Sequence, residues 1–212
     1  MSKRIDSTRF IYHWIKAEPF ERIQENDYET AFAVLLKIIY DGSVKSGEPF
    51  KTGYKSCICF TESPEYFMHS DRSKYQPFGV KYLKDYVFSQ GGRTVIYMPL
   101  REKNLLHDEL LWRYMLHDPI SFSDERPFGV DFTWEREWRL PAEELSILDA
   151  YSIIVPDSSY IDRIIKITDR WLDENAHEEY IRSHGRLEDP DPGFQDYIDD
   201  IRSMLSTPDR LF

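Results

Sequence analysis

The segment RFIYHWIK, residues 9–16, constrains the fold of this chain more than any other segment. With the two-residue period of a strand, its Phe, Tyr and Trp side chains lie on one face, while Ile11, His13 and Ile15 lie on the other. A strand that is apolar on both faces has to be covered on both sides, which is typical of the interior of a sheet. We therefore expect this segment to form a central strand.

The other segments predict short strands and helices without the regular alternation of a doubly wound fold. Residues 29–40 place apolar side chains at the i, i+3, i+4, i+7 spacing of a helix, and Asp41-Gly42 is a helix-ending signal. The other elements that we expect are strands at residues 56–60, 94–99, 132–140 and 151–156, and helices at residues 108–117, from 158 onward and at 194–205.

This mixture of elements favours the α+β class, and the composition agrees with one compact domain. The chain has 212 residues, of which 41% are hydrophobic and 15% aromatic, so it is long enough to bury a sizeable core. We expect an α+β domain over residues 1–156. Residues 157–212 are expected to form a helical C-terminal extension packed on that domain.

The formal net charge of −11 disfavours a generic grip on phosphate backbones. A nucleic-acid partner would need local basic residues, for which the nearest candidates are Lys51, Lys55, Arg72 and Lys74. The most apolar run, AFAVLLKIIY, is too short to span a bilayer, and the first residues contain no apolar signal-peptide core. We expect a cytoplasmic protein without a membrane segment, in which Cys57 and Cys59 are free core thiols.

The segment FTWEREWRLP, residues 132–141, places charges among large aromatic side chains. Read as one strand, its two Trp residues share a core face with Arg136, while Glu135, Glu137 and Arg139 share the other face. The two carboxylates would then lie about 6.6 Å apart, at ~3.3 Å per residue. They could form a structural ion pair with Arg139, or they could stabilise positive charge that develops on a sugar.

Sugar chemistry of that kind includes glycoside hydrolysis, for which this spacing is at the edge of the inverting range, and transfer of ADP-ribose from NAD. Two further segments carry candidate residues. His13 is either a satisfied core histidine or a donor to a ribose hydroxyl or carbonyl of a bound nucleotide. The segment CFTESPEYF, residues 59–67, ends a strand with Thr61 and Ser63, which either start an ordinary turn or lie at the edge of a cleft.

Taken in order, these segments resemble the ADP-ribosyltransferase fold. YHW, residues 12–14, resembles its first motif, and CFTESPEYF is similar to the second motif of the DarT toxins that modify DNA. GGRTVIYMP resembles the strand that follows it there, and REWRLPAEELSILDAYSIIVP resembles the strand of the catalytic Glu and the closing strand. The order of motifs over residues 9–156 also resembles bacterial abortive-infection proteins of the AbiGi type.

The resemblance implies a split mixed or antiparallel sheet, surrounded by helices, around a cleft for NAD, which is a substrate; no metal is implied. Glu137 would be the catalytic glutamate that holds the ribose 2′-hydroxyl, Glu135 would orient the acceptor, and His13 would contact a ribose. The residues expected to contact NAD are His13, Tyr12, Thr61, Ser63, Lys55 and Arg139. Arg136 and Arg93 are further candidates for phosphate or acceptor contacts.

The implied activity is transfer of ADP-ribose from NAD to a nucleic-acid or protein acceptor. A bacterial toxin or phage-defence effector of this kind would have a cognate antitoxin or a complex subunit as a partner. The alternative that we keep is a non-catalytic, antitoxin-like or regulatory interaction module with the same fold. The acidic balance of the chain and its aromatic-rich, helical C-terminus from Ser158 to Phe212 would suit such a protein partner.

Overall fold

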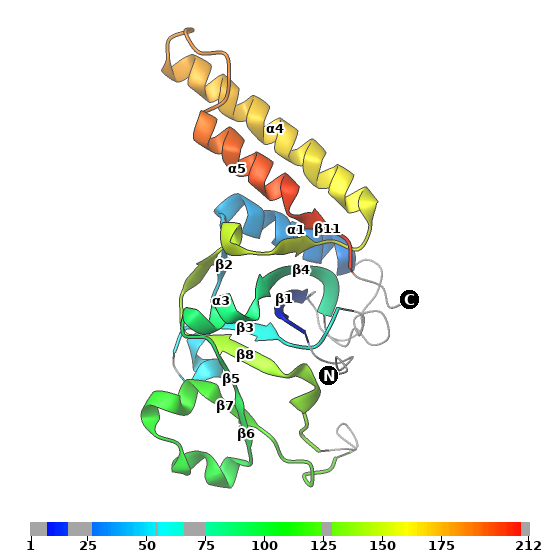
Figure 1. Cartoon of the computed structure of the whole chain (residues 1–212), viewed down its shortest axis with the longest axis vertical. Coiled ribbons are helices and arrows are strands. Elements are labelled where there is room, and N and C mark those ends of the chain that lie inside the picture. The colour runs from blue at the N-terminus through cyan, green and yellow to red at the C-terminus, as the bar shows by residue number, and fades with distance from the viewer. Residues whose placement is uncertain (1–7, 17–26, 54, 66–74, 124–128, 209–212) are drawn as a thin grey trace.

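A seven-stranded sheet, mostly antiparallel, forms the centre of this α+β protein (Figure 1). A computed structural model describes residues 8–16, 27–53, 55–65, 75–123 and 129–208. The strand order is β11-β10-β4-β1-β3-β8-β5, and only the β10–β11 pair is parallel. The strands are β1 (Phe10–Lys16), β3 (Ile58–Thr61), β4 (Tyr75–Leu83), β5 (Arg93–Thr94), β8 (Glu137–Leu140), β10 (Ser152–Ile154) and β11 (Leu205–Ser206).

The prediction that residues 9–16 form a central strand is confirmed, because β1 is the fourth of the seven strands. Its two faces also divide as expected. Ile11 and Ile15 belong to the large core cluster, whereas Tyr12 and Trp14 pack with Ile154 in a small cluster on the opposite face. This second face carries the candidate site.

One layer of the core lies between the sheet and helix α1 (Asp27–Asp41), which confirms the expected helix and its end before Gly42. Phe32, Leu35 and Ile39 are buried in the same cluster as Phe78 of β4, because the helical spacing puts them on one face. The chain continues into β2 (Ser43–Lys45), which pairs with β9 (Glu144–Ser146) in a separate small sheet.

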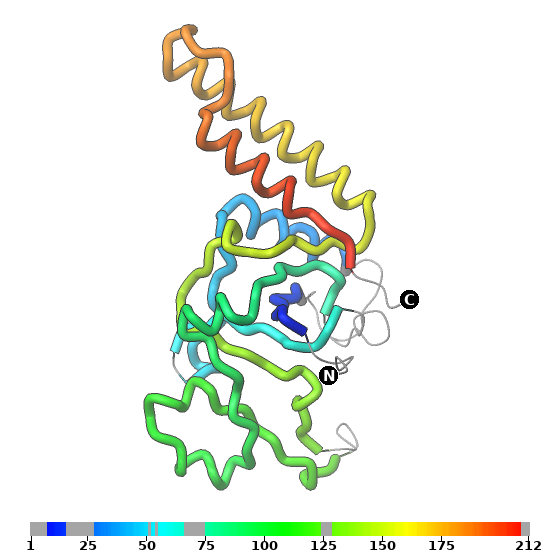
Figure 2. The backbone as a smooth tube through the Cα atoms, in the orientation of Figure 1, coloured from blue at the N-terminus to red at the C-terminus, as the bar shows by residue number. Residues whose placement is uncertain are grey.

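Helices α4 (Ser158–Arg182) and α5 (Pro192–Ser203) form a long hairpin that extends away from the sheet (Figure 1). Asp157 caps α4: its carboxylate accepts from the backbone N–H of Ser159 at 2.8 Å. The expectation of helix alone after Pro156 is wrong at the end of the chain. There β11 returns beside β10 as an edge strand of the sheet (Figure 2).

The opposite end of the molecule is a lobe built on the parallel strands β6 (Ile96–Met98) and β7 (Tyr114–Leu116). Two 3₁₀ segments join these strands, η2 (Leu100–Leu105) and η3 (Asp108–Arg113). Two predictions are corrected here. The strand expected at residues 94–99 is divided between β5 of the central sheet and β6 of the lobe. The helix expected at 108–117 is a 3₁₀ turn followed by β7, because the end of this segment pairs with β6.

The strand expected over residues 132–140 begins only at Glu137. Residues Thr133–Glu135 form a 3₁₀ turn, η4, and Arg136 then adopts a left-handed conformation with φ 47°. The turn is held by Asp131, whose Oδ1 accepts from the backbone N–H and the hydroxyl of Thr133. The two-residue period of a strand therefore does not extend before β8. The separation of the Glu135 and Glu137 carboxylates cannot be derived from this period for the same reason.

The break in the strand also changes which aromatic side chains are buried. Trp138 of β8 is in the core as expected, but Phe132 is 37% exposed and Trp134 is 50% exposed. The remaining short elements are α3 (Lys84–Ser89), η1 (Pro49–Thr52) and η5 (Ile147–Asp149). Among the described residues, no helix is long and apolar enough to cross a membrane.

Candidate functional site

One row of side chains crosses five neighbouring strands on the face opposite the large core. It consists of Ser152, Lys81, Tyr12, Thr61 and Glu137, each paired in register with the next. Residues paired in this way point to the same face of a sheet. The segments that contribute the last three residues are far apart in sequence, so it is the fold that brings them side by side.

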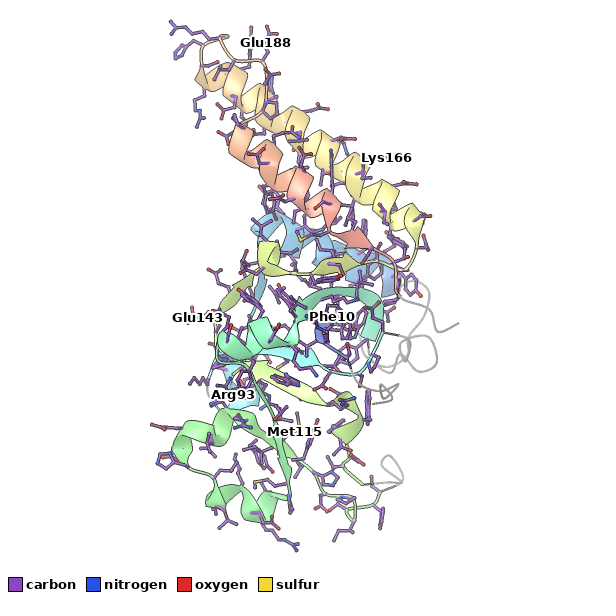
Figure 3. The ribbon with its side chains drawn as sticks, viewed as in Figure 1. Phe10, Arg93, Met115, Glu143, Lys166 and Glu188 are labelled. Atoms are coloured by element: carbon purple, nitrogen blue, oxygen red, sulfur yellow. The ribbon has the colours of Figure 1, made fainter. Side chains whose placement is uncertain are left out.

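A cavity of about 430 Å³ lies over the last three residues of this row. That volume is in the range of small-molecule sites. Its walls come from β1, β3, β8, the start of β4 and the lobe strand β7; Figure 3 labels Met115 of β7. Six of the residues that we predicted for the site line it: Tyr12, His13, Thr61, Glu135, Glu137 and Arg139.

The two strands at the base of the cavity separate from each other. β1 and β3 share a single register pair, Tyr12 with Thr61, whereas β1 pairs with β4 at six positions. Beyond that pair, Nδ1 of His13 lies 2.9 Å from the backbone carbonyl of Cys59. Since a carbonyl can only accept, Nδ1 carries the proton in this contact. His13 thus bridges the opening between the strands.

His13 approaches the cavity from a different side than Tyr12. It shares the face of Ile11 and Ile15, and its ring lies edge-on to that of Phe60, with centroids 6.1 Å apart. It therefore reaches the cavity at the gap between β1 and β3, and Glu137 stands on the opposite face of the sheet.

Glu137 is held by a buried ion pair within its own strand. Its Oε1 lies 2.7 Å from Nε of Arg139, and the two side chains are 9% and 4% exposed. The Arg139 guanidinium also donates to the carbonyls of Trp112 and Tyr114, at 2.7 and 2.9 Å. Arg139, expected to contact NAD, is thus engaged by protein groups and fixes the position of the Glu137 carboxylate.

Glu135 reaches the same cavity from the 3₁₀ turn rather than from the strand. Its carbonyl accepts from the hydroxyl of Thr61, and its Oε2 accepts from the hydroxyl of Tyr75 at 3.2 Å. Burial raises the pKa of Tyr75, and the negative charges of Glu135 and Glu137 raise it further. Tyr75 therefore stays a neutral phenol that can donate to Glu135.

Tyr75 belongs to the site, although the sequence reasoning did not single it out. It begins β4 after a polar stretch of sequence, and the sequence around it carries no recognisable motif. Tyr97 of β6 was also missed. Its hydroxyl accepts from the backbone N–H of Glu137 at 3.1 Å and donates to the carbonyl of Phe132 at 3.2 Å, which ties the lobe to β8.

Cys59 lies at the base of the cavity and is exposed there, so the expectation of two core thiols holds only for buried Cys57. The Cys59 side chain is accessible from the cavity but is otherwise surrounded by protein. This removal from bulk solvent raises the pKa of the thiol to about 12, and the nearby Glu137 carboxylate, to which the thiol donates, contributes to the rise. The thiol is therefore neutral at physiological pH.

Glu62 points away from the cavity. Its carboxylate pairs with Arg136 at 2.6 Å and Lys84 at 2.7 Å, and it accepts from the indole N–H of Trp138 at 2.9 Å. These contacts explain the otherwise puzzling Arg136, whose left-handed backbone turns its side chain toward Glu62. No negative charge from Glu62 enters the site.

The remaining candidates lie elsewhere. The hydroxyl of Ser63 donates to the carbonyl of Trp134 at 2.6 Å, and the Lys55 ammonium lies 5.7 Å from the centre of the Trp112 ring; neither residue lines the cavity. Arg93 donates to the carbonyls of Phe88 and Gly92 and stacks on the Phe88 ring. The basic candidates Lys51, Arg72 and Lys74 lie outside the described side chains.

The site combines two carboxylates, a guanidinium that anchors one of them, and an aromatic wall. In the described part of the chain, no group of three or more His, Cys, Asp or Glu side chains is placed to hold a metal ion. Comparisons with protein families, with curated proteins and with solved structures found no match. The fold and the site define an α+β protein with an acidic cavity at the point where strands β1 and β3 separate.

Proposed function

We propose that this protein transfers ADP-ribose from NAD to a nucleic-acid or protein acceptor. The observation that carries the proposal is the convergence of Glu137, Thr61 and Tyr12 in one row beneath a single cavity. Each belongs to a different segment of the resemblance to ADP-ribosyltransferases. The separation of β1 from β3 at this cavity supports the split sheet that the resemblance implies.

The chemistry of ADP-ribosyl transfer suits the charges in the cavity. The bond between C1′ of the ribose and the pyridinium nitrogen breaks, and its electron pair leaves with neutral nicotinamide. Positive charge then spreads over C1′ and the ring oxygen until an acceptor atom donates an electron pair to C1′ and loses its proton. A fixed carboxylate beside this charge stabilises the transition state more than the ground state.

In this proposal, Glu137 accepts a hydrogen bond from the 2′-hydroxyl of the reacting ribose. The contact with Arg139 and the backbone contact with Tyr97 hold Glu137 in place, so the carboxylate does not have to reorganise during the reaction. Glu135, held by Tyr75, is placed to orient the acceptor and receive its proton. His13, at the gap between the strands, would contact the dinucleotide from the base of the cavity.

Labelled NAD tests the proposal. The chain is incubated with NAD that carries the label in the ADP-ribose part, together with single-stranded DNA, RNA or a bacterial protein extract. Transfer of label to one acceptor class by the wild type is expected, with a loss of about 100-fold or more in Glu137→Gln. Glu188→Gln, the same change at an exposed position on the helical hairpin, is the matched control (Figure 3). No label on any acceptor would count against the proposal.

A second candidate is a non-catalytic interaction module with the same fold. It is favoured by the burial of the Glu137–Arg139 pair, since ion pairs of this kind also serve structure alone. The projecting α4–α5 hairpin offers a surface for a partner. In that case wild type and Glu137→Gln would neither bind nor cleave NAD, and the substitution would change only the stability of the chain.

A further inference from the structure

The indole N–H of Trp14 is a buried donor that lines the cavity. Trp14 is 5% exposed, and its Nε1 has no hydrogen-bond partner among the described residues. A buried donor without a partner costs free energy, and most such groups in proteins are satisfied. A ligand in the cavity can supply the missing acceptor.

The packing of the ring determines the direction of this N–H. A Cβ atom added at Gly79 of β4 would lie 2.6 Å from Cε3 of Trp14, so that edge of the indole rests directly on β4. Cε3 and Nε1 lie on opposite edges of an indole. The N–H therefore faces away from β4, toward the side of β1 where β3 separates and the cavity opens.

A second polar atom without a partner lines the same cavity from the lobe strand β7. The hydroxyl of Tyr114 on β7 is buried and has no partner in the described part of the chain, although its ring lines the cavity. Burial raises the pKa of this phenol, so it stays neutral and can donate or accept. The cavity thus presents an indole donor from β1 and a phenol from β7 to a bound ligand.

The charges around the Trp14 and Tyr114 groups restrict which hydrogen-bond acceptor a bound ligand can carry. Glu135 and Glu137 line the same cavity, while Arg139 is already engaged by Glu137 and two carbonyls. A phosphate or carboxylate here would face two negative charges without an available guanidinium. The rings of Tyr12 and Trp14, which both line the cavity, are stacked within 7° of parallel and add aromatic surface to the lining. A flat ligand with a neutral carbonyl oxygen fits these conditions.

We propose that Trp14 donates a hydrogen bond from Nε1 to the carboxamide oxygen of a flat heteroaromatic ring bound in the cavity. This inference rests on the proposed function, in which that ring is the nicotinamide of NAD. The positive charge of the pyridinium would lie on the side of Glu135 and Glu137. Trp14 is then a residue that selects the ligand by its carboxamide, and the Tyr114 hydroxyl offers a further polar contact from the lobe side of the cavity.

Free nicotinamide and 3-methylpyridine, which lacks the carboxamide, are the two probes. Both are titrated into the full chain while the indole N–H signals of the tryptophans are followed by ¹⁵N-resolved NMR. Nicotinamide is expected to move the Trp14 signal downfield, as a new hydrogen bond does, whereas 3-methylpyridine, which cannot accept this hydrogen bond, is expected to produce no such downfield shift. Nicotinic acid, whose carboxylate would face the two glutamates, is expected to bind more weakly than nicotinamide.

Substitution separates the hydrogen bond from the ring packing. Trp14→Phe is expected to bind nicotinamide about tenfold more weakly than wild type, with no comparable loss for 3-methylpyridine. Trp134→Phe, at an exposed tryptophan outside the cavity lining, is the control and should bind both probes as wild type does. Equal losses for both probes in Trp14→Phe would overturn the proposal, as would a Trp14 signal that nicotinamide does not move.

The two proposals fail in distinguishable ways, because the probe titrations need no turnover. If nicotinamide moves the Trp14 signal but labelled NAD is never consumed, the ligand contact stands and the transferase function fails. If NAD is consumed but Trp14→Phe binds nicotinamide like wild type, the transferase function stands and this contact fails. The NMR titration of the wild type decides the contact even if the variant does not fold.

Discussion

Glu137 and Arg139 lie two residues apart on β8, and Nε of Arg139 contacts Oε1 of Glu137 at 2.7 Å with both side chains buried. Two carbonyls hold the same guanidinium, so Arg139 is anchored on three sides. Removing one partner of such a pair leaves an uncompensated buried charge, which is more costly than the pair is favourable. The pair therefore links the stability of β8 to the geometry of the site.

We expect Arg139→Met to lower the free energy of unfolding by about 3–5 kcal/mol, because Glu137 and two carbonyls lose their partner. Glu137→Gln should cost less, since an amide oxygen can still accept from Arg139. Urea unfolding of both single variants and the double variant measures the coupling. A coupling energy near zero would mean that the two side chains do not act as a pair.

The Cys59 thiol should react slowly with iodoacetamide, because its pKa of about 12 leaves almost no thiolate at pH 8. The alkylation rate, measured in a Cys57→Ala background, should keep rising with pH beyond the range in which an ordinary thiol has levelled off. Glu137→Gln removes one cause of the raised pKa and should speed alkylation at pH 8. A rate that levels off near pH 9 would contradict the placement of this thiol.

Gly79→Ala should destabilise the protein by about 1–3 kcal/mol, because the new Cβ would lie 2.6 Å from the Trp14 ring and 2.9 Å from the His13 carbonyl. The same variant should weaken nicotinamide binding, since it displaces the indole. Gly47→Ala is the control, because nothing lies within 4 Å of a Cβ added there. Thermal unfolding of the two variants provides the comparison, and equal melting temperatures would contradict the packing described.

Asp131→Ala should cost about 1 kcal/mol, as the loss of a comparable helix cap does, because Asp131 holds the turn that carries Glu135. The hydrogen bonds from Thr133 lower the pKa of Asp131. A carboxyl group whose pKa is lower in the folded state contributes stability above its unfolded pKa, and that contribution disappears as pH falls through the folded value. The difference in stability between wild type and variant should therefore shrink below about pH 4.

The alternation of apolar and polar residues was sufficient to predict the central strand and part of the candidate site. The apolar residues on both faces of residues 9–16 predicted a central strand, and period two placed Glu137 and Arg139 on the cavity face. The same period failed at residues 132–136. There the contacts from Asp131 to Thr133 and the left-handed Arg136 form a turn, and a pattern of side-chain polarity does not report on backbone contacts of this kind.

Other parts of the fold depend on contacts distant in sequence. Strand β4 was not predicted because Pro77 and Gly79 are residues that usually interrupt strands. The structure accommodates Pro77 where the pairing with β1 shifts register between Trp14 and Lys16, and it needs Gly79 beneath the Trp14 ring. Tyr75 reaches the site through the pairing of β4 with β1, and Tyr97 reaches it from the lobe strand β6, so no local pattern could have identified them.

The central claim is that Glu137 serves the cleavage of NAD, and the most direct measurement is the rate of nicotinamide release from NAD. It should be compared among wild type, Glu137→Gln and the exposed control Glu188→Gln, in the presence of the acceptor that takes up label. The account predicts release by wild type and Glu188→Gln, and a fall of about 100-fold or more in Glu137→Gln. Equal rates in all three proteins would contradict it.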